Sequence, residues 1–187
     1  MVAYLKKNVL LVFIVAILFL VVSSDARLSM MVTKTEIDSI CTSKYINSSH
    51  CFEVLNSIPK IAKLDFPGLT KVLISYQSLA ISKTLKQIKL LERNTTDWKT
   101  INLCGRLYEG ALHDNDRSLG FLAAKDYDSF YYRISGVSIN IATCNDELKT
   151  MKPIPQFLIM ESTVIDNIVL MIERILECYI TKETVKC

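Results

Sequence analysis

The sequence contains few of the residues on which enzyme chemistry usually depends. Its 187 residues include two histidines and five scattered glycines. Two histidines leave little material for a Ser–His–Asp or Cys–His arrangement, and the glycines form no phosphate-binding loop. His113, with Asp114 and Asp116 close behind it, is interpreted as a polar surface patch. We therefore find no catalytic set, and we expect neither a cofactor nor enzymatic activity.

Proline and glycine are also too scarce for a β-rich fold. The four prolines are Pro59, Pro67, Pro153 and Pro155, and none lies between Pro67 and Pro153. Proline interrupts helices, so its absence leaves room for long ones. Alternating apolar residues with hairpin turns are missing as well. These absences predict an all-α protein.

The charge balance is nearly even and excludes two classes of partner. The formal net charge is +3, and removal of residues 1–26 lowers it to +2 because Lys6, Lys7 and Asp25 are lost. Neither nucleic acid nor an anionic membrane is indicated by so small a charge.

The first 26 residues have the pattern of a secretory signal peptide. Lys6-Lys7 precedes an unbroken apolar run from Val9 to Val22, and Ser24-Asp25-Ala26 supplies small residues for cleavage. The run is short for a membrane-spanning helix, although an uncleaved anchor is the alternative. We expect cleavage after Ala26, with cleavage after Ser24 as the second choice, and a secreted, extracellular domain of residues 27–187.

Six cysteines follow the signal segment, and an even number in a secreted chain indicates disulfides. Cys104 and Cys144 lie equally far from a break at Leu122–Asp126, so they should be level on neighbouring antiparallel helices. A smaller hairpin around Asn47-Ser48-Ser49 would bring Cys41 to Cys51. Cys178 and Cys187 either pair with each other or stay free. Zinc binding is disfavoured because no Cys-x-x-Cys is present.

Helical periodicity predicts two structural parts. Residues 33–58 form a small helical hairpin that begins at a Thr33–Glu36 capping box. Residues 69–178 form a four-helix bundle, with helices at about 69–91, 97–119, 126–144 and 162–178, and Gly120 as a helix end. The short connections favour an up-down-up-down order. The inward stripe of the first bundle helix includes Leu79. Gly105 and Gly110 suggest close helix contact.

Two surface features follow from the predicted turns. Asn47 and Asn94 lie in glycosylation sequons within these turns, so both are expected to carry glycans. Aromatic residues gather near the turn between the second and third bundle helices; they are Phe121, Tyr127, Phe130, Tyr131 and Tyr132. They either anchor a partner or, for Phe130 and Tyr131, fill the end of the bundle.

Several short segments match the motifs of one known family. They are residues 102–111, 125–129, 143–146 and 166–170, together with the order and spacing of Cys41, Cys51, Cys104 and Cys144. On these residues the chain resembles the plant inhibitors of pectin methylesterase and invertase over about residues 35–178. The resemblance implies an apoplastic inhibitor, monomeric when free, that covers the substrate cleft of a cell-wall enzyme in a 1:1 complex.

Departures from the family pattern bear on the target. Invertase inhibitors of this family often carry Pro-Lys-Phe at the turn where this chain has Lys125, Asp126 and Tyr127. These three residues are the candidate partner contacts, and the departure favours pectin methylesterase over invertase. Gly136 and Val137 replace small alanines. A secreted helical protein that binds lipid or a receptor, without inhibition, is the alternative from another class.

Overall fold

A computed structural model describes residues 31–93 and 95–181, so the predicted signal peptide lies outside the described residues. Within the described residues the chain is helical apart from one isolated β-bridge, between Met31 and Asp65. The helices in chain order are α2 (Lys34–Cys41), α3 (Ser48–Ser57), the 3₁₀ turn η1 (Ile61–Lys63), α4 (Phe66–Glu92), α5 (Trp98–Ala124), α6 (Tyr127–Leu148), α7 (Gln156–Ile175) and the π-helical turn η2 (Leu176–Ile180).

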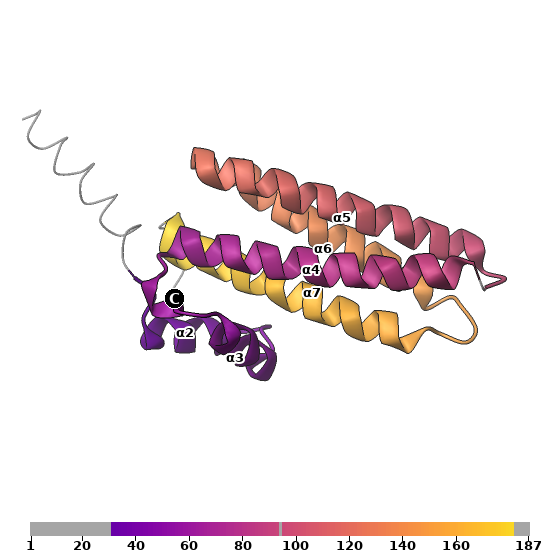
Figure 1. Cartoon of the computed structure of the whole chain (residues 1–187), viewed down its shortest axis with the longest axis horizontal. Coiled ribbons are helices and arrows are strands. Elements are labelled where there is room, and N and C mark those ends of the chain that lie inside the picture. Colours follow the sequence, from indigo (N-terminus) through magenta and orange to yellow (C-terminus); the bar gives the residue numbers. More distant parts are fainter. Residues whose placement is uncertain (1–30, 94, 182–187) are drawn as a thin grey trace, which may run out of the picture.

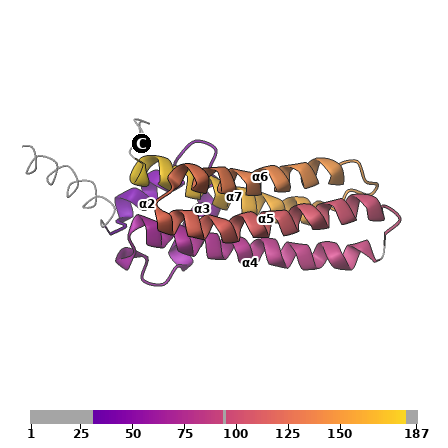
Figure 2. The ribbon, with the colours of Figure 1, turned by 90° about the horizontal axis from the view of Figure 1, so that it is seen from above.

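Helices α4 to α7 form the predicted up-down-up-down bundle. Helix α5 packs between α4 and α6, and α7 closes the ring by packing on both α6 and α4. The α2–α3 hairpin lies at one end of the bundle against α7, and the α5–α6 turn and η2 lie at this same end (Figures 1 and 2). None of the described helices is both long and apolar enough to cross a membrane. The all-α fold class is therefore confirmed.

Side-chain caps fix where the helices begin. The Thr33 backbone N–H donates to the Glu36 carboxylate at 2.6 Å, which completes the predicted capping box. Asp65 accepts a hydrogen bond from the Gly68 N–H at 2.7 Å and starts α4 earlier than predicted. The prediction began after Pro67, but proline is well suited to the first turn of a helix. Asp126 caps α6 in the same way.

Two further predicted boundaries are wrong. Gly120 does not end its helix, because α5 continues to Ala124 and the left-handed residue that follows is Lys125, with φ of 57°. Helix α7 begins at Gln156, well before Ser162, since Pro155 can occupy the position just before a helix.

The predicted core is largely correct, with one clear error in α4. Leu79 was expected to face inward, but 69% of its surface is exposed. The position two residues earlier, Gln77, is fully buried. Periodicity weighted by hydrophobicity selects leucine over glutamine, so the true phase of the helix was missed at this turn.

Gly136 of α6 leaves room for a side chain of α5. A Cβ atom at this position would lie 2.8 Å from Asp114 Oδ2. Asp114 in turn accepts a hydrogen bond from Arg133 at 3.0 Å, so the glycine accommodates a half-buried ion pair. Asp114 therefore does not belong to an exposed polar patch, as its sequence neighbours had suggested. The contacts at Gly105 and Gly110 are ordinary van der Waals distances.

The structure contains both disulfides expected from hairpin geometry. Cys41 and Cys51 join α2 to α3 with a Cα–Cα distance of 5.4 Å. Cys104 and Cys144 join α5 to α6 with a Cα–Cα distance of 4.9 Å, and both are fully buried. The third expected pair involves Cys187, which lies outside the described residues. That pair remains a prediction.

Candidate functional site

The turn between α5 and α6 is held by backbone hydrogen bonds. The Lys125 N–H donates to the Leu122 carbonyl at 3.2 Å, and the Asp126 N–H donates to the Phe121 carbonyl at 3.0 Å. This pair of hydrogen bonds forms a Schellman motif. In such a motif glycine normally occupies the left-handed position, which Lys125 occupies here. The turn is therefore short and rigid.

The three candidate contact residues have different roles within this turn. Lys125 takes the left-handed conformation, Asp126 accepts the Ser129 N–H at 3.2 Å, and Tyr127 is partly buried against the core. All three line a shallow hollow of about 390 Å³. Ile180 and Thr181 form its other wall, and nothing in the sequence connects these two residues with the turn.

The neighbouring aromatic residues divide between core and surface. Phe130 is fully buried and fills the end of the bundle, as one interpretation expected. Tyr131 and Tyr132 do not, since 44% and 73% of their surfaces are exposed. Both tyrosines line a second hollow, of about 420 Å³, between the first turns of α6 and the η2 turn.

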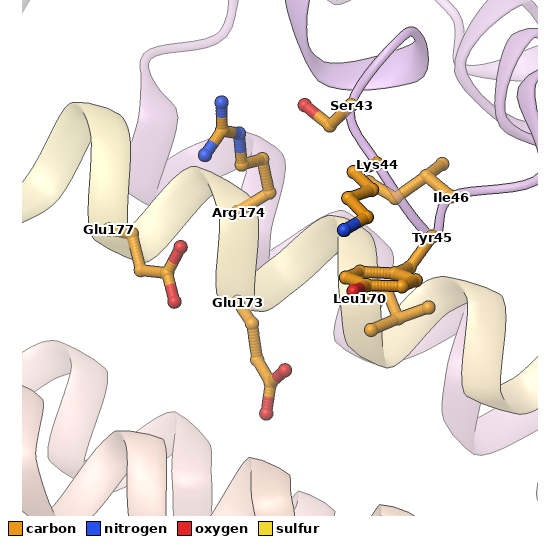
Figure 3. Close-up of a pocket in the computed structure, with 8 residues that line it drawn as sticks. All are labelled: Ser43, Lys44, Tyr45, Ile46, Leu170, Glu173, Arg174 and Glu177. Carbon is orange, nitrogen blue, oxygen red and sulfur yellow. The ribbon is translucent and has the colours of Figure 1, made fainter. Parts of the chain in front are cut away.

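A third hollow, of about 470 Å³, separates the loop between α2 and α3 from the end of α7 (Figure 3). Tyr45 stands in this loop with φ of 73°, a rare conformation for a bulky residue, and the Lys44 ammonium lies 4.7 Å from its ring centre. From α7, Glu173 and Arg174 point away from each other in Figure 3. The three hollows surround the end of α7.

One hydrogen bond attaches this loop to the bundle. The Asn47 backbone N–H donates to Asn167 Oδ1 at 2.7 Å, across 120 positions of sequence. Asn167 is almost fully buried on α7. In the sequence Asn167 is recognisable only as part of a motif, because a single polar residue in an apolar helix carries no information about its partner.

Carboxyl groups are partly buried along α7. Burial raises the pKa of Asp166 to about 6, and a hydrogen bond from the Ser138 hydroxyl opposes this shift. Burial also raises the pKa of Glu173, with a contribution from the negative charge of Glu177, while the hydrogen bond from Ser135 opposes it. Both carboxyl groups are therefore protonated more easily than carboxyl groups in water.

Tyr108 of α5 lies in the same polar part of the interior. Burial raises its pKa, and the negative charges of Asp166 and Glu161 add to the effect. Glu161 itself binds Lys83 of α4 at 2.7 Å. In the described part of the chain, histidine, cysteine and carboxylate side chains form no cluster that could hold a metal ion.

The two sequons differ in what the structure describes. Asn47 is exposed, and its side-chain oxygen accepts the His50 N–H at 3.1 Å at the start of α3. Asn94 lies outside the described residues. Glycosylation at both positions stays a prediction.

Comparison with known proteins links this geometry to a family. Residues 35–171 match the family model described as plant invertase/pectin methylesterase inhibitor. A protein named pectinesterase inhibitor 1 from Arabidopsis thaliana is 25% identical over 171 residues, which cover 90% of this chain and 92% of the relative. A pectinesterase inhibitor from Actinidia deliciosa is 28% identical over 156 residues, which cover 82% and 83%.

Solved structures share the same fold. A pectin methylesterase inhibitor from Arabidopsis thaliana aligns with a TM-score of 0.58 at 22% identity, covering 77% of this chain and 95% of the solved one. A mutant form of such an inhibitor aligns with a TM-score of 0.67 at 23% identity, covering 75% and 94%. The chain belongs to the plant invertase/pectin methylesterase inhibitor family.

Proposed function

We propose that this protein inhibits a plant cell-wall pectin methylesterase by covering its substrate cleft in a 1:1 complex. The observation that carries the proposal is the family match, together with two relatives that are named pectinesterase inhibitors and align along most of the chain. The proposal requires no chemistry of the inhibitor itself. Inhibition would come from occupying the surface that the substrate needs.

The rigidity of the molecule supports this mode of action. A disulfide joins α5 to α6, and the α5–α6 turn is closed by two backbone hydrogen bonds. A surface that is already ordered loses little conformational entropy when it binds, so more of the contact energy appears as affinity. Lys125, Asp126 and Tyr127 are the proposed partner contacts.

Invertase is the second candidate target, because the family description names both enzymes. In that case the α5–α6 turn would enter the invertase active site. The turn here carries Lys125, Asp126 and Tyr127 in place of Pro-Lys-Phe, which is why pectin methylesterase is preferred.

The proposed setting is the plant apoplast. Residues 1–26 would direct secretion and be removed, and residues 27–187 would form the inhibitor domain, monomeric when free. Glycans on Asn47 and Asn94 and a Cys178–Cys187 disulfide are further parts of this proposal. Peptide mapping without reduction, before and after glycosidase treatment, tests the two glycans and the Cys178–Cys187 disulfide.

An inhibition panel tests the target. Residues 27–187, produced with oxidised disulfides, are added to several plant pectin methylesterases and invertases; methanol release reports the first and glucose release the second. We expect inhibition of at least one pectin methylesterase at micromolar or lower concentration, with 1:1 stoichiometry in size-exclusion chromatography. Inhibition of invertases alone would transfer the proposal to the second target. If no enzyme is inhibited, the inhibitor proposal fails, and lipid extracted from the purified protein would then support the lipid-binding alternative.

A further inference from the structure

The hollow between α6 and η2 combines aromatic rings with carboxylates. Its lining residues are Tyr127, Asp128, Tyr131, Tyr132, Leu176, Glu177 and Thr181, and its volume is about 420 Å³. Tyr127 and Tyr131 are four positions apart on α6, as are Asp128 and Tyr132, so both pairs share one face of the helix. We call this site the tyrosine–acid hollow.

The charge of the hollow is negative. Asp128 comes from α6 and Glu177 from η2, and none of the described lining residues is lysine or arginine. Burial is the main cause of the raised pKa of Glu173 one turn earlier, and the negative charge of Glu177 adds to it. An anionic ligand such as a uronic acid polymer would be repelled here.

The walls of the hollow are held in position. The Thr181 N–H donates to the Leu176 carbonyl at 2.9 Å, which closes the π-helical turn, and such turns often occur at functional sites. The Tyr179 ring stacks on Phe66 of α4 with ring centres 4.3 Å apart. Leu176 is buried and forms the floor. A binding group would therefore meet an ordered site.

Aromatic faces next to carboxylates attract organic cations. The negative face of a tyrosine ring stabilises an ammonium or guanidinium group, and the carboxylates add charge-assisted hydrogen bonds. This chain already shows the first interaction nearby, since the Arg133 guanidinium lies 5.9 Å from the centre of the Tyr132 ring. Because one cation already approaches Tyr132, Tyr131 is the ring better placed for another.

We propose that the tyrosine–acid hollow receives a lysine or arginine side chain presented by the target enzyme. The inference rests on the proposed inhibitory function and adds the chemistry of one contact. A protruding basic side chain suits the hollow in size and charge. It would be held between Tyr131 and the carboxylates of Asp128 and Glu177.

A titration without any enzyme tests the chemistry of the hollow. N-acetyl-arginine amide is added to the full mature chain while the tyrosine ring signals are followed by NMR, and N-acetyl-citrulline amide serves as the neutral control of equal shape. We expect shifts at Tyr127, Tyr131 and Tyr132 with the arginine compound alone. Glu177→Gln should weaken these shifts roughly three- to tenfold. Glu53→Gln, which removes an exposed carboxylate on α3, should leave them unchanged.

Equal shifts with arginine and citrulline compounds, or none with either, would overturn the proposal. Lys182 and Lys186 follow the hollow's last lining residue, Thr181, in the sequence and supply two further cations. If the arginine compound acts only on a Lys182→Gln/Lys186→Gln variant, the hollow serves a lysine of this chain, and the enzyme is excluded as its source.

A second arm uses whichever enzyme the wild-type protein inhibits. Tyr131→Ala and Glu177→Gln should each raise the inhibition constant roughly three- to tenfold, and Glu53→Gln should not. Circular dichroism confirms that each variant is folded. Normal inhibition by both variants would overturn the inference while leaving the proposed function intact. Failure of the wild type to inhibit any enzyme would overturn the proposed function, and the arginine titration would then still decide whether the hollow binds cations.

Discussion

Single residues at the α5–α6 turn combine a structural cost with a proposed contact. Lys125 holds a left-handed backbone conformation that costs an L-residue roughly 1–2 kcal/mol. Glycine is the residue that usually occupies this position in a Schellman motif. A lysine retained where glycine would fit better is a reason to examine its side chain for function.

Two substitutions at Lys125 distinguish its backbone strain from its proposed contact with the target enzyme. Lys125→Gly should raise the free energy of unfolding by about 0.5–1 kcal/mol, because the strain is removed. Lys125→Ala keeps the strain and should bring no such gain. Both remove the ammonium group, so both should weaken inhibition to a similar extent. Urea unfolding and the inhibition assay measure the two effects, and undiminished inhibition by both variants would exclude Lys125 as a contact.

The Asp166 carboxyl makes stability depend on pH. Its pKa in the folded protein, about 6, is above the ordinary value of 3.8, so the folded state binds more protons than the unfolded state between these values. The free energy of unfolding contributed by this group is therefore highest at low pH and falls as the pH rises towards 6. The Ser138 hydroxyl donates a hydrogen bond to Asp166, and the charge of Asp166 acts on Tyr108.

Asp166→Asn should remove this dependence. At pH 7 the variant should be more stable than the wild type by about 1–2 kcal/mol, less than the full pKa difference implies because the carboxyl is partly exposed. At pH 3.5 the two proteins should be nearly equal, since the wild-type carboxyl is then protonated. Denaturant unfolding across this range measures the difference, and a constant gap at every pH would show that ionisation of Asp166 is not its cause.

At the scale of elements, the α2–α3 hairpin depends on the bundle for its position. Its helices are too short to be stable alone, and it meets α7 through the bond from the Asn47 N–H to Asn167. Asn167→Ala leaves that N–H without its acceptor and should cost about 1–3 kcal/mol. We expect faster amide exchange in α2 and α3 with little change in α5 and α6. Thr163→Ala, which changes an exposed residue of the same helix, serves as the control variant. Uniform acceleration over all helices would contradict the local role.

The helices themselves could be predicted because the apolar residues repeat at helical spacing and proline is absent from the bundle centre. What the sequence could not provide are the features that depend on distant residues. Gln77 is buried in the core, although a polar side chain is expected at the surface. Asn167 accepts a hydrogen bond from a backbone N–H group 120 positions away. The α5–α6 turn was located from the spacing of Cys104 and Cys144. Its second wall, from Ile180 and Thr181, required the bundle to close.

At the scale of the whole molecule, the two described disulfides constrain different loops. The Cys104–Cys144 bond closes a loop that contains the α5–α6 turn, and the Cys41–Cys51 bond closes the loop that carries Tyr45. Both loops border hollows at the end of α7. The protein thus places a disulfide-closed loop next to two of the hollows in its described part, which lowers the ordering cost of binding there.

Removing each disulfide in turn should reveal this division. In the chain-entropy model the longer loop is worth about 4 kcal/mol and the shorter about 3 kcal/mol. Cys104→Ala/Cys144→Ala should lower the Tm of the bundle by roughly 8–16 °C and weaken inhibition, because the turn gains freedom. Cys41→Ala/Cys51→Ala should mainly loosen α2 and α3, with a smaller change in the main transition. Calorimetry and amide exchange on both variants distinguish these outcomes. If both variants instead show a single unfolding transition with an equally lowered Tm, the hairpin and the bundle unfold as one unit. The Cys41–Cys51 disulfide would then stabilise the α5–α6 turn as much as the Cys104–Cys144 disulfide does.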